Sequence, residues 1–593
     1  MRIYRLLLLF VIGILFAQTA LAGSGHTTLL ATSEPFEGGV TADLFLETKP
    51  GTGKIFIESF PLTKVDTQIS TRFAKEVACS YLGKSCDELD FFYTIKADAV
   101  IIGGPSAGAA MATLTVAVLE GVELNETVAI TGTINSGNVI GHVGGISEKI
   151  EAASDAGIKK VLIPKGERSN FARNISIDMV EYGRDLGIEI VEVFSLDEAV
   201  QEFTGKTFTP DDEKIEVDTK YSEVMKELAA GLCRRTERLK GNVESSSINR
   251  SLEDAKTVAE NLSQQGVDAT AKGSFYAAAS FCFGANVRYK FLDLISEELS
   301  DEDILSELEN VNERVDEIRK NLKNASTVSD AQILAIVLDR LTEAERHTNV
   351  SATLLNQQRV NSIYELAFSI ERIESATAWS QFFEVMGESA ITEDVLKNAC
   401  ISKLAEAQER IEYASILLRG VSESSRLRLA EAQAFVETKD YVQCLHKATL
   451  SKSEANTLLS VFGVRDEEIE EIVDRKLTAA RTSIARQKEI FPIVGYSYYE
   501  YANSLKDTDK YSALLFLDYA LEFSNIDIYF KDSTTQELNV TQVKTAEEAT
   551  PVAFYFIAGI ALGIVLTIVL KKATKRKKKR ILINRAKKKI VSK

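Results

Sequence analysis

The chain has 593 residues, of which 45% are apolar and 26% are charged, so it is long enough for several globular domains and disorder is not expected. Its formal charge is −17, although residues 571–593 hold thirteen Lys or Arg and no acid. Without these cations and the two arginines of residues 1–22, the body of the chain carries −32. This acidic body argues against nucleic-acid binding outside the tail.

The N-terminal segment, residues 1–22, has the parts of a secretory signal peptide. Arg2 and Arg5 precede an apolar run, and Ala20-Leu-Ala22 supplies a small-residue cleavage pattern. We therefore expect a signal peptide that is removed. The alternative is an uncleaved N-terminal anchor, for which the apolar run is short.

The C-terminal region predicts a membrane anchor. Residues 551–570 form an uncharged, mostly apolar run long enough to cross a bilayer, and the basic residues 571–593 follow at once. Positive residues remain on the cytoplasmic side. We therefore expect a single-pass protein of the cell membrane, with a linker at 531–550, the bulk of the chain on the extracytoplasmic side, and a basic cytoplasmic tail that contacts anionic lipids.

The six cysteines agree with an oxidising compartment, because their number is even and none forms a C-x-x-C motif. Six cysteines allow fifteen connectivities. One of them pairs sequence neighbours: 79 with 86, 233 with 282, and 400 with 444.

A serine stands at a predicted strand-to-helix turn. The apolar residues 99–102 predict the end of a strand, a Gly-Gly-Pro turn follows, and residues 106–121 predict a buried helix. Ser106 therefore lies at a helix N-terminus, where backbone N–H groups without intrahelical partners can face a developing oxyanion. The turn and oxyanion backbone is assigned to Gly104, Pro105 and Ala107.

A base for this serine must also be found, and the chain has only four histidines. A buried lysine can serve, because desolvation disfavours its ammonium form and lowers its pKa. Lys149 is the candidate, since it lies in the first turn of a predicted helix over 147–156 with buried apolar neighbours. A helix N-terminus also disfavours a nearby cation.

Four motifs in register resemble the proteolytic domain of the Lon family, over about residues 27–208. The resemblance implies an α/β Lon-type fold with Ser106 as nucleophile, Lys149 as base and Thr131 in contact with the lysine. Two positions depart from the family pattern: Gly103 stands where many members have an acidic residue, and Thr133 where they often have glutamate. The motifs are Gly103-Gly-Pro-Ser-Ala-Gly108, Ala129-Ile-Thr-Gly132, Gly144-Gly-Ile-Ser-Glu-Lys149 and Gly157-Ile-Lys-Lys-Val-Leu-Ile-Pro164.

Lon proteases usually couple this domain to an ATP-driven unfoldase, but no phosphate loop is found here. The nearest candidate, Thr48-Lys-Pro-Gly-Thr-Gly-Lys54, lacks the first glycine and the closing Ser or Thr of the motif. We interpret it as a turn that leads into a strand. The sequence therefore predicts ATP-independent action, and no cofactor or metal is assigned.

The rest of the body predicts helices. A polar linker at 209–220 precedes a helical, solenoid-like domain at 221–530. Seams with spacings of four and three run from Ile304 to Leu322 and from Leu404 to Leu418, and helical hairpins are predicted at 428–450 and 499–523. This domain is interpreted either as a surface that recruits substrates or assembles the protein, or as a spacer and oligomer scaffold.

Three functions remain open at this stage. The first is a membrane-anchored serine endopeptidase with a Ser-Lys dyad, acting on unfolded or exposed polypeptide segments. The second is a catalytically degenerate Lon-like surface scaffold whose helical domain binds partner proteins, an alternative kept open by Gly103. The third is a protease that processes only its own chain. Lon-type domains commonly form rings, so the resemblance also leaves a homo-oligomer open.

Overall fold

The computed structural model describes residues 23–32, 38–172, 175–208, 214–245, 252–383, 390–418, 422–488, 490–525 and 527–530. The predicted signal peptide and the predicted span at 551–570 lie outside these ranges. Within them, no helix is both long enough and apolar enough to cross a bilayer.

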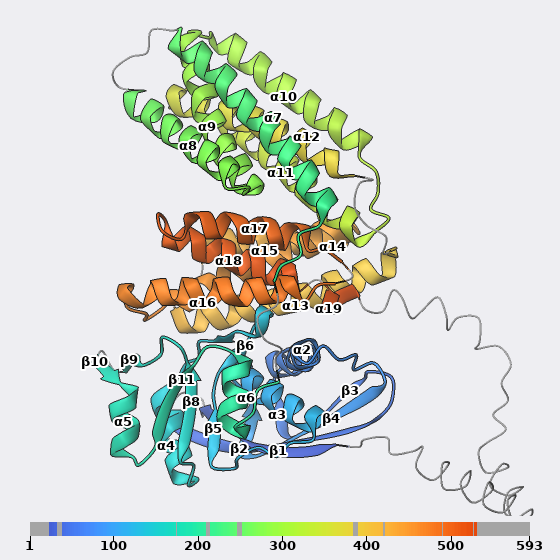
Figure 1. The fold of residues 1–593 in the computed structure, drawn as a ribbon, viewed down its shortest axis with the longest axis vertical. Helices are drawn as coiled ribbons and strands as arrows, with labels where there is room; N and C mark the ends of the chain where they lie inside the picture. Colours follow the sequence, from blue (N-terminus) through green and yellow to red (C-terminus); the bar gives the residue numbers. More distant parts are fainter. Residues whose placement is uncertain are drawn as a thin grey trace, which may run out of the picture. The chain divides into compact units, whose positions relative to one another are not determined.

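Seven strands form one mixed sheet in the order β11-β8-β5-β1-β2-β4-β3 (Figure 1). Strands β1, β5, β8 and β11 are parallel neighbours, β1, β2 and β4 form an antiparallel meander, and β3 lies parallel to β4 at the edge. The strands are β1 (Ser24–Thr32), β2 (Gly39–Pro50), β3 (Ile55–Thr63), β4 (Leu89–Ile102), β5 (Val128–Ile130), β8 (Lys160–Pro164) and β11 (Glu189–Val193).

Helices cover both faces of this sheet. Successive residues of a strand point to opposite faces, so Leu29 joins the core beneath α2, α3 and α6, whereas Leu30 joins the core beneath α4 and α5. Both leucines are buried. The helices are α2 (Val65–Tyr81), α3 (Gly108–Glu120), α4 (Ile146–Asp155), α5 (Met179–Asp185) and α6 (Leu196–Thr204).

Short elements complete this α/β part. Strand β6 (Thr133–Ile134) pairs with β7 (Ile140–Gly141), and β9 (Ser169–Ala172) pairs with β10 (Ile175–Asp178). The described residues also form the 3-10 turns η1 (Pro105–Ala107), η2 (Ser136–Asn138) and η4 (Ser380–Phe382).

The α/β prediction is confirmed, with one difference at the serine turn. The helix predicted over 106–121 is a 3-10 turn, η1, followed by α3 from Gly108. Proline suits the first position of such a turn because its missing N–H is not needed there. The glycine-rich segment at 48–54 comprises the end of β2 and, from residue 51, the predicted turn that leads into β3, where Gly53 has a φ of +80° that favours glycine.

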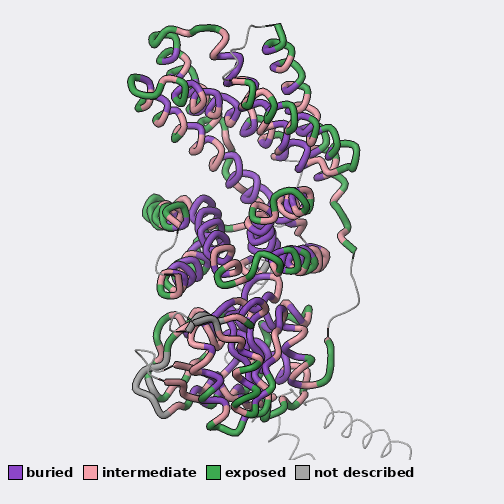
Figure 2. Tube along the Cα trace, turned by 90° about the vertical axis from the view of Figure 1, so that its left-hand side faces the viewer, coloured by how far each residue is buried: buried purple, intermediate pink, exposed green. Residues whose placement is uncertain are grey.

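From residue 219 onward every regular element of the described chain is helical, apart from one isolated bridge. Neighbouring helices pack as hairpins whose apolar faces are buried (Figure 2). The predicted hairpins correspond to α14–α15 and α17–α18. The helices are α7 (Thr219–Glu244), α8 (Glu253–Ala271), α9 (Phe275–Ser296), α10 (Asp301–Asn321), α11 (Val328–Leu354), α12 (Arg359–Trp379), α13 (Glu393–Leu418), α14 (Glu423–Glu437), α15 (Tyr441–Val461), α16 (Asp466–Ala485), α17 (Ile493–Leu505), α18 (Lys510–Ser524) and α19 (Asp527–Phe530).

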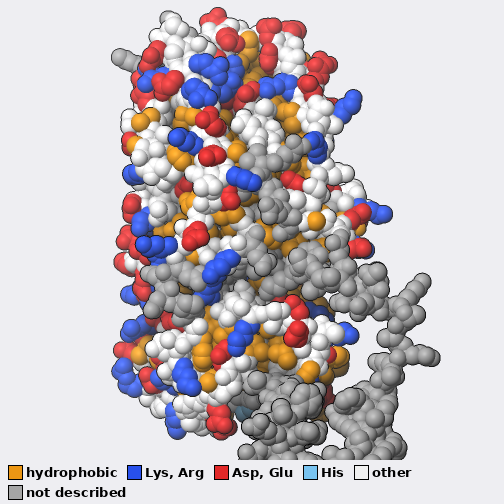
Figure 3. All heavy atoms as spheres, turned by 45° about the vertical axis from the view of Figure 1, so that its right-hand side comes forward, with side chains coloured by type: hydrophobic (Ala, Val, Ile, Leu, Met, Phe, Trp, Pro, Cys, Tyr) orange, Lys and Arg blue, Asp and Glu red, His pale blue; other side chains and the backbone are white. Residues whose placement is uncertain are grey.

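The predicted seam over 304–322 faces inward on α10. Ile304, Leu308, Val311 and Val315 are all buried, which the spacing of four and three predicts. On the outside, charged side chains of both signs are interspersed over the face that Figure 3 shows.

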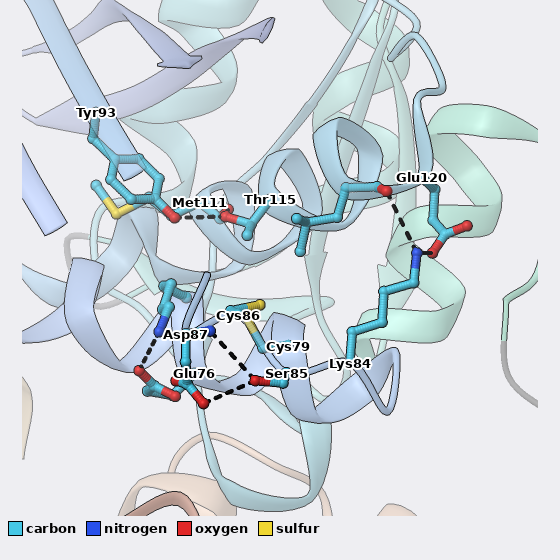
Figure 4. Close-up of a disulfide and its surroundings, with 12 residues drawn as sticks. Glu76, Cys79, Lys84, Ser85, Cys86, Asp87, Tyr93, Met111, Thr115 and Glu120 are labelled. Carbon is cyan, nitrogen blue, oxygen red and sulfur yellow. Dashed lines mark hydrogen bonds and ion pairs between the residues drawn. A yellow bond between two sulfur atoms is a disulfide. The ribbon is translucent and has the colours of Figure 1, made fainter. Parts of the chain in front are cut away.

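All six cysteines form disulfides between sequence neighbours: Cys79–Cys86, Cys233–Cys282 and Cys400–Cys444. The first closes the turn after α2 (Figure 4). In the same region, the Lys84 ammonium lies 2.6 Å from the Glu120 carboxylate at the end of α3. This ion pair therefore links the C-terminal end of α3 to the turn that follows α2. Helix α3 is the helix that follows Ser106.

Candidate active site

Ser106 lies where β4 gives way to α3. Gly104 has a φ of +102°, a conformation that L side chains rarely adopt, and it reverses the chain before η1. Ser106 is the second residue of this turn and is partly exposed. The α2 side chain Ser70 donates to the Pro105 carbonyl oxygen at 3.4 Å. A hydrogen bond from α2 therefore stabilises the turn, and the partial exposure of Ser106 leaves its side chain accessible to a substrate.

Only some of the backbone N–H groups of η1 are available to stabilise an oxyanion. The first three N–H groups of a 3-10 helix have no intrahelical acceptor, and Pro105 carries no N–H. The available donors are therefore Ser106 and Ala107. Gly108 N–H is already engaged, because it donates to the Pro105 carbonyl. Gly104 and Pro105 shape the turn, whereas the N–H groups that follow them can face a negatively charged oxygen.

Lys149 lies in the first turn of α4, as predicted, and its side chain is only 3% exposed. Its Nζ donates to Thr131 Oγ1 at 3.1 Å, and Thr131 is fully buried. Burial lowers the pKa of Lys149 to about 8, because the ammonium form loses hydration, although Glu167 and Glu148 oppose this shift. A fraction of Lys149 is therefore neutral near physiological pH.

The segment Thr131–Gly132 connects the serine to the lysine. Thr131 accepts the hydrogen bond from Lys149, and the next residue, Gly132, donates its N–H to the Ser106 carbonyl oxygen at 2.9 Å. Gly132 also accepts from Ala109 N–H at 3.0 Å. Between Ser106 Oγ and Lys149 Nζ themselves, no hydrogen bond is formed in the described part of the chain. The two side chains are thus held by one short segment, without the direct contact that proton transfer requires.

A buried carboxyl group, Glu167, accompanies the lysine, and the sequence analysis missed it. It follows β8 and accepts Val143 N–H at 3.3 Å. Burial raises its pKa to about 8, although the Val143 N–H and Lys149 oppose this shift. Near neutral pH the carboxyl is therefore largely protonated, and it does not provide a full negative charge that would keep Lys149 protonated. The detectable signal was an acid just after a parallel strand, where α/β sites commonly lie.

Thr133 and Gly103, the two positions that depart from the family pattern, each lie next to a basic side chain. Thr133 Oγ1 accepts a hydrogen bond from Arg410 Nη1 of α13 at 3.1 Å. At Gly103, a Cβ atom would lie 2.5 Å from Cδ of Lys64, so the lysine methylenes occupy the space next to this glycine. The places where the family pattern has acids are therefore adjacent to basic side chains in this chain.

Histidine does not replace lysine as the base at this site. His142, the histidine nearest in sequence to the Lys149 helix, is 6% exposed, and its Nε2 has no hydrogen-bond partner in the described structure. Burial, followed by the charge of Lys476, lowers the pKa of His142 to about 4. His26 instead pairs with Asp43 at 3.2 Å.

The geometry suits acyl transfer through an activated hydroxyl. It combines a partly exposed serine, unpaired N–H groups beside it, and a buried lysine whose neutral form is accessible. The helical domain also takes part, since Tyr413 Oη accepts Gly144 N–H at 3.1 Å. No pattern in the sequence predicted that α13, more than 260 residues away along the chain, would contact this loop.

Comparisons with known proteins agree with this geometry. Residues 66–202 match the Lon protease (S16) C-terminal proteolytic domain, and all four motifs fall within that range. A Lon protease of Lachnoclostridium phytofermentans is 29% identical over 28% of this chain and 20% of its own length. An archaeal Lon protease of Archaeoglobus fulgidus is 30% identical over 20% of this chain and 18% of its own length.

A Lon protease of Azospirillum brasilense is likewise 30% identical, over 30% of this chain and 21% of its own length. The chain thus spans about a fifth of the length of these curated relatives. The match to the family model lies within the α/β part. Residues 66–202 belong to the Lon proteolytic domain family.

Proposed function

We propose that this protein is a serine endopeptidase in which Ser106 is the nucleophile and Lys149 the general base. The observation that carries the proposal is the burial of Lys149 against Thr131, next to the glycine whose N–H holds the Ser106 backbone. A buried lysine with a lowered pKa is able to accept a proton near neutral pH. The membership of the α/β part in a peptidase family supports the same conclusion.

The reaction would follow the usual course of acyl transfer. Neutral Lys149 takes the proton of Ser106 as Oγ attacks the peptide carbonyl carbon, and the N–H groups of Ser106 and Ala107 stabilise the oxyanion. Lys149 then protonates the leaving amine, and the C–N bond breaks. Water, activated by the same lysine, hydrolyses the acyl-enzyme. Because Ser106 and Lys149 are not hydrogen-bonded in the substrate-free structure, their side chains must approach each other before the proton transfer.

The expected substrates are unfolded or exposed polypeptide segments. The described chain consists of the α/β part and the helical domain, and the sequence contains no phosphate-loop motif. An enzyme that acts without a coupled unfoldase cleaves segments that already present an extended backbone. We accordingly propose ATP-independent action.

We place the enzyme at the cell membrane, with the catalytic part on the extracytoplasmic side. Three disulfides support an oxidising environment, and the sequence supports an N-terminal export signal and a C-terminal span followed by a basic tail. The proposal also accommodates a homo-oligomer, since this family commonly forms rings.

The test is active-site labelling of the full-length protein, purified in detergent without ATP. A serine-reactive fluorophosphonate should label wild-type protein at Ser106, and the Ser106→Ala and Lys149→Ala variants should not react. Ser245→Ala provides a matched control, because Ser245 is exposed at the end of α7. Peptidase activity on an unfolded polypeptide should follow the labelling and should not change when ATP is added.

Other outcomes lead to different conclusions. A folded wild-type protein that neither reacts nor cleaves would favour the scaffold function over catalysis. A shortened form of the wild-type chain that is absent from Lys149→Ala, without cleavage of added polypeptides, would indicate that the protein processes only itself.

A further inference from the structure

Helix α13 of the helical domain contacts the loop that precedes α4, the helix that carries the proposed catalytic lysine. This loop, residues 142–145, runs directly into α4, and Gly145 begins the helix with a φ of +66°. Gly144 N–H donates to Tyr413 Oη of α13 at 3.1 Å. The preceding N–H, that of Val143, donates to Glu167. Two successive donors of the loop are thus held, one by the protease domain and one by the helical domain.

Two further side chains on the same face of α13, Arg410 and Leu417, contact residues near Lys149. Arg410 lies one turn before Tyr413, and its Nη1 donates to Thr133 Oγ1 at 3.1 Å; both Arg410 and Thr133 are buried. Leu417 lies one turn after Tyr413, and its Cδ2 would stand 2.7 Å from a Cβ atom at Gly144. Residues spaced by three and four share one helix face, so these contacts act together.

Both contacts lie close to Lys149, the base of the proposed dyad. Thr133 is two residues beyond Thr131, which accepts the hydrogen bond of Lys149, and Gly144 is five residues before Lys149. A Cβ atom at Gly144 would require the end of the Leu417 side chain to shift, so α13 approaches this glycine closely.

Helix α13 is itself firmly held within the helical domain. The disulfide Cys400–Cys444 joins it to α15. Lys403 Nζ lies 2.8 Å from a carboxylate oxygen of Glu522 on α18, and both groups are buried. A helix fixed at these points can hold the loop in one place.

We propose that α13 positions the Lys149 loop for catalysis, with Tyr413 and Arg410 as positioning residues, so that the helical domain is an integral part of the catalytic unit. This inference rests on the proposed peptidase function. It gives the helical domain a role at the reaction centre, in addition to any role in recruiting substrates or assembling the protein.

Loss of the contact between Tyr413 and Gly144 should change the access of water to Lys149. Without the Tyr413 hydroxyl, Gly144 N–H loses its acceptor, and an unsatisfied donor near the surface recruits water. Water beside the loop lessens the desolvation of Lys149 and moves its pKa back toward the ordinary value of about 10.4. The neutral base then becomes scarcer at pH 7 but not at high pH. The loss of activity should therefore depend on pH.

The experiment compares the rate of fluorophosphonate labelling at Ser106 in full-length wild-type protein and Tyr413→Phe, from about pH 6 to about pH 9.5. The variant should react about five- to tenfold more slowly near pH 7 and within about twofold of wild type at the highest pH, as a pKa rise of nearly one unit requires. Tyr511→Phe is the matched control, because it removes a hydroxyl that binds Asp466 on the exposed surface.

A loss of labelling rate that is larger at low pH than at high pH distinguishes a positioning role of Tyr413 from a general loss of structure. A pH profile of Tyr413→Phe that matches wild type, or a loss that is equal at every pH, would overturn the inference while leaving the peptidase function intact. Leu417→Ala, which keeps every polar group, should shift the profile in the same direction, and it serves as the second variant should Tyr413→Phe fold poorly. An unlabelled wild-type protein would overturn the proposed function and this inference with it.

Discussion

The clearest consequence of the site geometry is a pH dependence that belongs to Lys149. With its pKa at about 8, roughly a tenth of the side chain is neutral at pH 7. A solvent-exposed lysine would be neutral to roughly 0.04%, so burial raises the concentration of the base by roughly 200-fold. The acylation rate of Ser106 should therefore rise about tenfold per pH unit below pH 8 and level off above it.

Replacing Lys149 by arginine should abolish this rise, because a guanidinium remains charged at every accessible pH. The expected loss is about 10²- to 10⁴-fold in the labelling rate, the usual contribution of a general base. Labelling is followed by the intact mass of the full-length protein, and Ser106→Ala measures the background. Lys159→Arg is the matched control, since Lys159 is an exposed lysine of the same domain.

The reasoning would be wrong if Lys149→Arg kept the pH profile of the wild type. In that case another group, with a pKa of its own near 8, would be the base. Glu167 is the only other group at this site, among the described residues, whose pKa is placed at about 8. A profile that survived Lys149→Arg and vanished in Glu167→Gln would identify it.

Three further changes test the surroundings of the dyad. Thr131→Val removes the acceptor of Lys149 Nζ, so kcat should fall about tenfold with little change in KM, whereas Thr131→Ser should keep the activity. The Glu167 carboxyl becomes negatively charged only as the pH approaches its pKa of about 8, and this charge then raises the pKa of Lys149, so in Glu167→Gln kcat/KM should level off at a pH lower by less than about one unit. Replacing Cys400 and Cys444 by serine should lower the free energy of unfolding by about 4 kcal/mol in a denaturant titration, because the open loop gains entropy when unfolded.

Much of the α/β part could be predicted from the sequence because its signals are local. The strand end at 99–102, the helix that carries Lys149 and the glycine turn before β3 follow from apolar runs, periodicity and turn residues. Strands β1 and β2 were not placed individually, and their pairing depends on contacts between distant segments. The disulfides join neighbours, and this was only one of fifteen connectivities that the sequence allowed.

The residues of the candidate site that belong to the family motifs could be predicted from the sequence, whereas the residues outside these motifs could not. Ser106, Thr131 and Lys149 come from three motifs, and the structure joins them through Thr131–Gly132. Arg410 and Tyr413 could not be found in this way. Both lie on a helix whose pattern only predicts burial, and their partners are more than 260 residues away in the chain.

The buried ion pairs of the helical domain fit the role proposed for α13. Lys403 and Lys452 lie among Glu406 and Glu522 with almost no exposure, at distances of 2.8 to 3.3 Å. Apolar side chains of similar size often stabilise a core at least as well, because charged groups lose hydration on burial. What charges add is a penalty for every packing in which a partner is missing, and this favours one placement of α13 against α15 and α18. A single placement is what Tyr413 requires, since its hydroxyl reaches Gly144 N–H only over a narrow range of helix positions.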